Sequence, residues 1–102
     1  MIIKVVFDFE DDYDYLYCPE NNISINKSQI KEMFYKWIDY TEEEHPFWCY
    51  ENGEKVGKCY RGDAIVYWLN KYIINDKESI DKAKLLESFS SKKLDYDIEI
   101  IL

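Results

Sequence analysis

The chain is poor in basic residues and has almost no arginine. Lysine and arginine together number 13 against 21 aspartates and glutamates, so the formal net charge is -8, and Arg61 is the only arginine. Proteins that bind nucleic acid directly use basic side chains to displace counterions from phosphates, and anionic membrane surfaces attract basic segments in the same way. The charge therefore argues against nucleic acid and membranes as direct ligands and favours a basic protein partner.

Glycine, proline and long apolar runs are scarce as well. The three glycines, Gly53, Gly57 and Gly62, form no G-x-G-x-x-G fingerprint and no phosphate-binding loop. No apolar run approaches the roughly 18 residues of a membrane-spanning helix. The N-terminal apolar stretch meets Asp8 too early to be the core of a secretion signal. We therefore expect a cytoplasmic protein.

Cysteine and histidine are too few and too scattered for recognisable chemistry. Cys18, Cys49 and Cys59 are irregularly spaced, and an odd number without a disulfide pattern is typical of free thiols in a reducing compartment. Structural zinc sites usually contain closely spaced ligand pairs, which this set lacks. His45, the only histidine, has no catalytic setting around it, so we expect a surface or helix-capping residue. The sequence thus predicts no metal, no cofactor and no catalytic residue, and hence a protein that is not an enzyme.

What the chain does contain is enough apolar material for one core. Of its 102 residues 47% are hydrophobic and 18% aromatic, which predicts a single folded domain over residues 1–102. Alternating apolar residues predict strands at 2–10, 13–18 and 94–102. Asn52–Gly53 between two aromatic-rich runs predicts a hairpin, with Cys49 opposite Val56.

Helical spacing of apolar residues occurs in three segments. Asn26 and Gln29 match a capping box before a helix whose apolar positions run from Ile30 to Ile38. A second helix is expected from Gly62 to Ile73, and a third over residues 77–87, using Ile80, Ala83 and Leu86. The predicted order is ββαββααβ. This defines an α+β fold with a mostly antiparallel sheet and helices packed on one face.

One face of the predicted sheet is rich in carboxylates and tyrosines. A two-residue loop at Asp11–Asp12 places Val6 opposite Tyr17 and turns Val5, Leu16 and Cys18 inward. No helix remains to cover the opposite face, and the last strand adds its acids if it pairs with the first. We expect that face to bind a partner; its residues are Asp8, Glu10, Tyr13, Tyr15, Tyr17, Asp95, Asp97 and Glu99. The alternative is a polar face that is merely solvated. On the second hairpin, Trp48 and Tyr50 share one side and are secondary contact candidates.

These features favour a non-catalytic inhibitor or adaptor that presents carboxylates to a basic protein, such as a nuclease or another nucleic-acid-binding protein. In size and charge the chain resembles the small acidic inhibitors of bacterial defence nucleases that phages and mobile elements carry, although it shares no motif with them. An immunity protein against a toxin nuclease fits equally well. Two other classes stay open. One is a small-molecule-binding or enzymatic domain that uses the second hairpin with Cys49 or Cys59, and the other is a homo-oligomeric structural protein.

Overall fold

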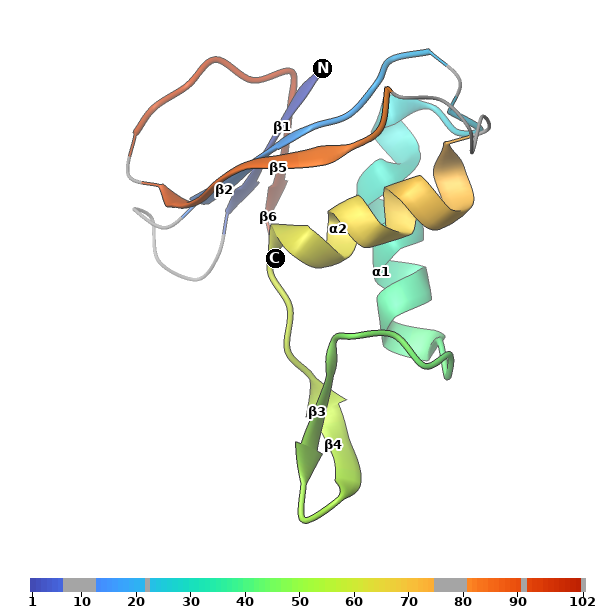
Figure 1. The fold of residues 1–102 in the computed structure, drawn as a ribbon. Helices are drawn as coiled ribbons and strands as arrows, with labels where there is room; N and C mark the ends of the chain where they lie inside the picture. The colour runs from blue at the N-terminus through green and yellow to red at the C-terminus, as the bar shows by residue number, and fades with distance from the viewer. Residues whose placement is uncertain (7–12, 22, 75–80, 91, 102) are drawn as a thin grey trace.

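A four-stranded mixed sheet forms one layer of the fold, with the helices beside it (Figure 1). The structure, a computed structural model, describes residues 1–6, 13–21, 23–74, 81–90 and 92–101. Strand β1 (Ile2–Val6) lies between β2 (Tyr13–Tyr17) and β6 (Ile98–Ile101), and β5 (Lys84–Ser90) pairs with the far side of β2. The β1–β2 and β2–β5 pairs are antiparallel, whereas β6 runs parallel to β1. The predicted α+β class is confirmed, and the first and last strands are indeed neighbours.

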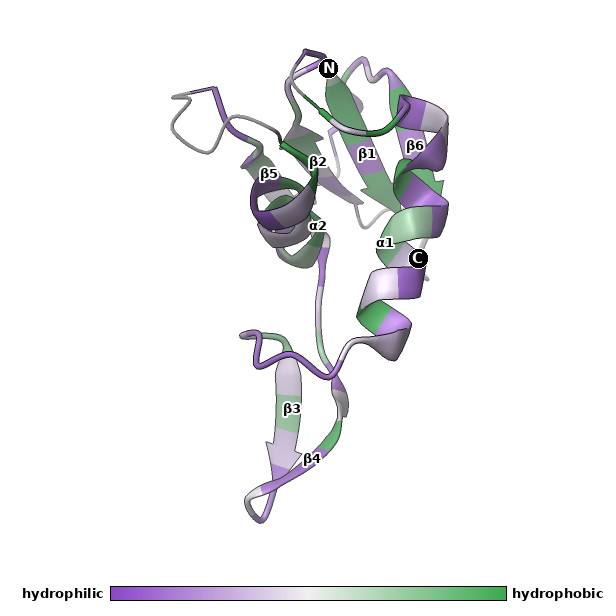
Figure 2. Cartoon of the chain, turned by 90° about the vertical axis from the view of Figure 1, so that its right-hand side faces the viewer, coloured by the Kyte–Doolittle hydropathy of each residue, from purple (hydrophilic) through white to green (hydrophobic). Residues whose placement is uncertain are grey.

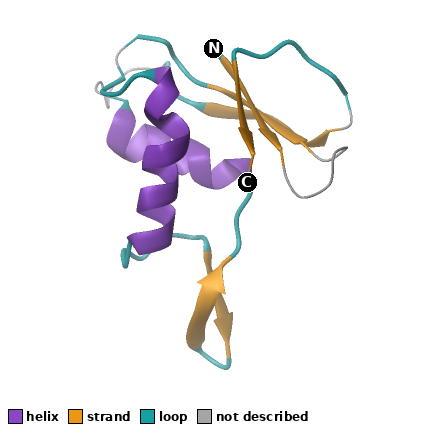
Figure 3. Cartoon of the chain, turned by 180° about the vertical axis from the view of Figure 1, so that it is seen from behind, coloured by secondary structure: helices purple, strands orange, loops and turns teal. Residues whose placement is uncertain are grey.

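Two helices pack against one face of this sheet (Figure 3). Helix α1 (Ile30–Tyr40) follows a 3₁₀ turn at Lys27–Gln29, where the Asn26 backbone N–H donates to the Gln29 side-chain oxygen at 2.9 Å. The predicted capping box is therefore present. Helix α2 (Gly62–Trp68) continues into a π-helical turn at Leu69–Ile73. Within the described residues, no helix is long and apolar enough to cross a membrane.

The hydrophobic core fills the space between the sheet and the helices. Each element contributes side chains at its own period: alternate residues from strands and every third or fourth residue from helices. The largest fully buried apolar core side chains include Ile3, Val5 and Leu16 of the sheet, Ile30, Phe34 and Ile38 of α1, and Ile65 and Leu69 of the second helix and its extension.

A buried carboxylate fixes the start of α2 to the sheet. Asp14 points inward from β2 and is 0% exposed. Its Oδ2 accepts the Gly62 N–H at 2.9 Å, and its Oδ1 accepts Arg61 Nη2 at 2.8 Å and the Phe89 N–H at 3.1 Å. A Cβ at Gly62 would lie only 2.8 Å from Leu16 Cδ2. This close approach explains why a glycine opens the helix.

The predicted third helix is wrong. Residues 84–90 form β5, which hydrogen-bonds to β2; residues 77–80 of the prediction lie outside the described part of the chain. Leu86, expected on the apolar side of that helix, is 50% exposed. Three apolar positions give only a weak helical preference, and pairing with the otherwise free edge of β2 overrides it. The observed order is ββαββαββ.

The predicted register of the first hairpin is wrong by four residues. The structure pairs Val6 with Tyr13 and Ile2 with Tyr17, not Val6 with Tyr17. Four is an even number, so every side chain keeps its predicted face. The expected turn at Asp11–Asp12 lies outside the described residues. The last strand begins at Ile98, not near residue 94.

Candidate functional site

The feature that stands apart from this body is the hairpin of β3 (Trp48–Glu51) and β4 (Glu54–Lys58), which projects as an arm (Figure 2). We call residues 48–58 the arm. Asn52 and Gly53 have φ angles of 52° and 82°, the left-handed conformations that a two-residue hairpin turn requires. The predicted Asn-Gly hairpin is therefore confirmed.

The two cysteines at the base of the arm are joined by a disulfide. The Cα atoms of Cys49 and Cys59 are 5.8 Å apart. A bulge between Cys49 and Tyr50 shifts the register, so that Cys49 pairs with Gly57 and not with Val56 as predicted. This shift brings Cys59 within reach of Cys49. The prediction of three free thiols is wrong for this pair; Cys18 alone is free, and it is buried.

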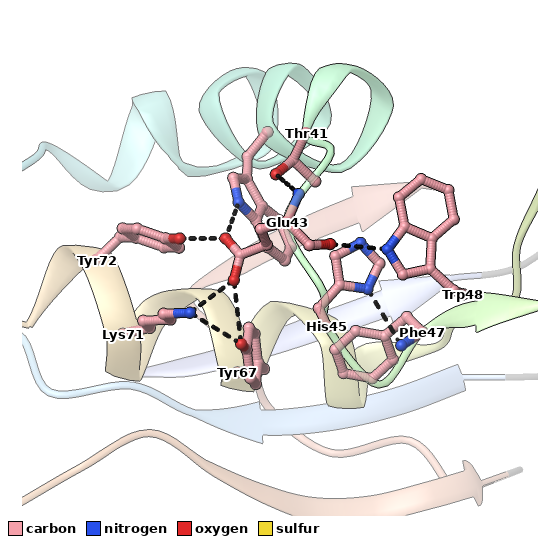
Figure 4. A network of polar contacts seen from close by, with 9 residues as sticks. Thr41, Glu43, His45, Phe47, Trp48, Tyr67, Lys71 and Tyr72 are labelled. Carbon is pink, nitrogen blue, oxygen red and sulfur yellow. Dashed lines mark hydrogen bonds and ion pairs between the residues drawn. The ribbon is translucent and has the colours of Figure 1, made fainter. Parts of the chain in front are cut away.

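Beneath the arm, one carboxylate joins the loop after α1 to both helices (Figure 4). Glu43 accepts hydrogen bonds from Trp37 Nε1 at 3.2 Å, the Tyr67 hydroxyl at 3.2 Å, Lys71 Nζ at 2.6 Å and the Tyr72 hydroxyl. Partial burial alone would raise the pKa of Glu43, but these four donors outweigh it and lower the pKa to about 2. Each carboxylate oxygen receives two donors. Glu43 is thus a poor general base and a strong structural anchor.

The single histidine lies beside these contacts of Glu43, at the junction of the arm, the loop after α1 and the two helices. His45 is 6% exposed, and its Nδ1 accepts the Phe47 N–H at 3.1 Å. The neutral ring therefore carries its proton on Nε2, which is buried without a partner in the described part of the chain. Burial lowers the pKa of His45. The predicted surface or capping histidine is wrong, because aromatic rings enclose this one.

Trp48 connects the junction to the arm. Its Nε1 donates to the Glu43 carbonyl oxygen at 2.7 Å, and its ring stacks on His45 with centroids 5.0 Å apart and planes 5° from parallel. The amines of Lys55 and Lys58 lie 4.7 and 4.8 Å from its ring centroid. Trp48, predicted as a contact residue, is thus half-buried and holds the root of the arm.

The rest of the arm is open to solvent. Tyr50, the other contact candidate, is 57% exposed, and Val56 is 59% exposed. At the tip Glu51 and Glu54 face each other across the strands, and both are exposed. Within the described residues, neither glutamate takes part in an ion pair. The arm therefore presents one aromatic ring, one branched apolar side chain and two unpaired carboxylates.

The open tyrosine face that the sequence predicts is not present. Tyr13 and Tyr15 are 6% and 0% exposed. The connection before β6 contacts Tyr15, whose hydroxyl donates to the Lys92 carbonyl at 2.9 Å and accepts the Leu94 N–H at 3.2 Å. The Tyr13 ring lies under the Lys4 amine, 4.1 Å from its centroid. Tyr17 is half-buried and donates to Asp81 Oδ1 at 2.8 Å. A loop covers this face where no helix was left to do so, and buried rings cannot serve as contact anchors.

The predicted carboxylates are only partly assembled. Asp8 and Glu10 lie outside the described residues. Asp95, Asp97 and Glu99 are exposed, but Asp97 accepts the Ile2 N–H at 2.7 Å and Glu99 lies 3.7 Å from Lys4 Nζ. Of these three, Asp95 is the one left without such a contact among the residues that the structure describes.

Sequence reasoning missed the Glu43 anchor and the disulfide. Glu43 sits in a run of three glutamates that looks like a simple end to α1, and nothing in the run marks the middle one. A different buried contact did have a usable signal. Arg61 is the only arginine in a chain that otherwise uses lysine, and its Nε and Nη2 both donate to Oδ1 of the buried Asp14.

No group of three or more histidine, cysteine, aspartate or glutamate side chains suited to a metal ion occurs among the described residues. A shallow surface hollow of about 520 Å³ lies along α1 and includes no residue of the arm; it is lined by Ser28, Lys31, Glu32, Tyr35, Lys36, Asp39 and Tyr40. Comparison with protein-family models, curated proteins and solved structures found no match to the chain. The fold and the site therefore describe a small α+β domain with a disulfide-linked arm.

Proposed function

We propose that the chain is a non-catalytic, acidic protein-binding module that inhibits a basic nucleic-acid-handling protein in the cytoplasm, with the arm as its main contact. The inhibitor expected from the sequence presents its carboxylates in place of nucleic-acid phosphates, as a DNA mimic would. That role is retained, but the contact surface moves from the sheet face to the arm. The observation that carries the proposal is the acidic tip, where Glu51 and Glu54 are cross-strand partners.

That pair does not stabilise the arm. Like charges directly opposite each other on neighbouring strands are unfavourable, by an amount on the order of a few tenths of a kcal/mol to 1 kcal/mol. A cationic surface that lies against Glu51 and Glu54 would offset their mutual repulsion, so the pair favours binding although it weakens the free hairpin. Tyr50 and Val56 add apolar contact area close by. The two lysines of the arm lie near its root, against Trp48, so the tip itself carries the carboxylates. A hairpin tip with two carboxylates and an exposed ring nearby suits a basic groove that otherwise holds phosphates.

The net charge acts over a longer range than the arm. A formal charge of -8 speeds association with a basic surface and makes it sensitive to salt. The arm then sets the dissociation rate through the groups that it buries. Blocking would be steric and electrostatic, and it requires no reacting group. The saturated Glu43 carboxylate and the enclosed His45 ring support this non-catalytic reading.

The test is capture from a lysate of host type at low and moderate salt. The arm variant combines Tyr50→Ala, Glu51→Gln and Glu54→Gln. A matched control combines Glu32→Gln, Asp39→Asn and Tyr40→Ala on α1, which removes the same two charges and one exposed tyrosine. We expect wild type and control to retain a basic nucleic-acid-handling protein, and the arm variant to lose it.

Purified partner then allows the affinity and its salt dependence to be measured directly. The arm variant should bind at least about tenfold more weakly, with a smaller dependence on salt, because exposed aromatic anchors are typical hot spots. Equal affinity of the arm variant and wild type would refute the arm as the contact surface. Loss of binding in the α1 control alone would move the contact surface to α1.

A further inference from the structure

The disulfide at the base of the arm is accessible to solvent on one side. Cys59 is exposed and Cys49 is half-buried, while Cys18 is fully buried. Burial raises the pKa of the Cys18 thiol to about 11. A thiol that stays protonated and buried takes little part in exchange. Cys49 and Cys59 are therefore the cysteines placed for thiol–disulfide chemistry.

Beyond its root, few other contacts hold the arm in one conformation: Tyr50 and Lys55 contact Glu44 in the loop after α1, and such exposed polar contacts contribute little. Its strands are four and five residues long, and an isolated two-stranded hairpin is marginal in water. Every residue from 50 to 57 is exposed. Residues 48–58 contribute no side chain to the hydrophobic core. The cross-link between Cys49 and Cys59 is thus the main constraint on the conformations open to the arm.

The root of the arm has contacts that do not depend on the cross-link. Trp48 is bonded to the Glu43 carbonyl, and the Cys59 N–H donates to the Phe47 carbonyl at 2.8 Å. Lys58 Nζ donates to the Ile38 carbonyl at the end of α1. Opening the disulfide therefore loosens the strands beyond the root and leaves the body of the domain in place.

We propose that Cys49 and Cys59 form a reversible thiol–disulfide site that switches the arm between an ordered oxidised form and a loose reduced form. The co-reactant is a dithiol, either a protein with a C-x-x-C pair or a small-molecule dithiol. In the cytoplasm, where the proposed function places the chain, disulfides that form are usually reversible and accessible, as this pair is.

The thiol–disulfide exchange proceeds in two steps. A thiolate of the dithiol attacks Sγ of Cys59, the more exposed of the two residues; the Cys49–Cys59 bond breaks, and the Cys49 thiolate leaves and takes up a proton. The second thiol of the reductant loses its proton and attacks its own partner sulfur in the mixed disulfide, which releases Cys59 as a thiolate that is protonated in turn. The protein gains two electrons and two protons, and the dithiol becomes a disulfide.

The effect on binding rests on the proposed function. If the arm is the contact surface, a loose arm must be ordered again when it binds, and this cost lowers the affinity. The oxidised form is then the inhibitor, and the reduced form is the weaker state.

The first test needs no partner. The full chain is reduced with dithiothreitol under native conditions, alkylated and weighed by mass spectrometry, and a parallel sample is followed by hydrogen exchange. We expect two alkylated cysteines, Cys49 and Cys59, with Cys18 labelled only after denaturation. The hydrogen-bonded amides of the arm should exchange about tenfold faster or more, while those of β1, β2 and α1 keep their protection. Reoxidation with oxidised dithiothreitol should restore the disulfide and the slower exchange of the arm amides.

Three results would overturn the proposal. The core amides could lose protection together with the arm, which would make the disulfide a structural one. The arm amides could keep their exchange rates after reduction. The native protein could also resist reduction altogether. A Cys49→Ser/Cys59→Ser variant should match the reduced wild type, and Cys18→Ala should still switch.

The binding test separates this proposal from the proposed function. Weaker capture of the partner by the Cys49→Ser/Cys59→Ser variant than by oxidised wild type would support the switch at the level of binding, and equal capture would contradict it. If neither form captures a partner while the exchange results hold, the proposed function fails and the thiol–disulfide site stands.

Discussion

The replacement of Asp14 by asparagine is the sharpest test of how the body of the domain is held together. Four donors surround this carboxylate: Nε and Nη2 of Arg61, and the backbone N–H groups of Gly62 and Phe89. Asparagine has nearly the same shape, but it loses the charge and points an NH₂ group at donors. Breaking a buried ion pair by removing one partner costs about 3–5 kcal/mol.

That loss is large for a chain of this size. Domains have unfolding free energies of about 5–15 kcal/mol, and about 1 kcal/mol corresponds to roughly 4 °C or more of melting temperature for about 100 residues. Asp14→Asn should therefore lower the melting temperature by roughly 12–20 °C. Thermal and urea unfolding, followed by circular dichroism and tryptophan fluorescence, would measure it.

The matched control is Asp95→Asn, an exposed aspartate, which should stay within about 0.5 kcal/mol of wild type. In a double-mutant cycle, Arg61→Ala should cost less in the Asp14→Asn background than in wild type, because the two residues are coupled. A change of under about 1 kcal/mol for Asp14→Asn would mean that this carboxylate does not hold α2 to the sheet.

Three further predictions concern stability. Glu43→Gln should cost about 1.5–3 kcal/mol in urea unfolding, because its NH₂ group faces donors; Glu42→Gln, an exposed neighbour, should be nearly neutral, and equal effects would contradict the Glu43 anchor. Gly62→Ala should cost about 1–3 kcal/mol from overpacking, against almost nothing for Gly57→Ala, where an added Cβ meets no atom within 4 Å. Acidification should destabilise the fold in two stages. The folded pKa of His45 lies below its usual 6.5, so stability falls as pH drops below about 6.5. Glu43, with a folded pKa of about 2, adds a loss between pH 4.5 and about 2. Unfolding free energies across pH would show both stages, and His45→Gln should remove the upper one.

Local patterns predicted the elements that local physics determines. The Asn52–Gly53 turn and the Asn26–Gln29 capping box depend on a few adjacent residues, and both are present. The alternation in β1 and β2 gave the correct inward side for each residue, even with the register displaced. The sequence was therefore sufficient for the class of fold and for the main helical and strand segments.

The rest depended on contacts between distant segments. β5 is a strand because its backbone hydrogen-bonds to the free edge of β2. The apolar spacing within residues 84–90 does not reveal that this partner strand is available. Tyr15 is buried by a connection 77 residues further along the chain. The register shift that brings Cys59 to Cys49 comes from a bulge, which periodicity does not reveal.

The expected exposure of Tyr13 and Tyr15 was wrong for the same reason. Tyrosines that alternate on a strand look exposed until it is known which loop crosses them. Of the two predicted contact residues on the second hairpin, Tyr50 keeps an exposed ring and Trp48 has a structural role. The carboxylate that joins the loop to both helices, Glu43, was hidden in a run of like residues. Exposure is a property of the assembled chain and cannot be inferred from one strand.

The separation of the arm from the core has an evolutionary consequence. Residues 50–57 can be replaced, lengthened or shortened with little effect on folding, because none of them belongs to the hydrophobic core. If the arm is the contact surface, natural variation in this segment is limited mainly by the turn and by the partner. A chain built in this way can change the chemistry of the tip while the α+β body stays the same, and the body serves as a scaffold on which other hairpins can be grafted.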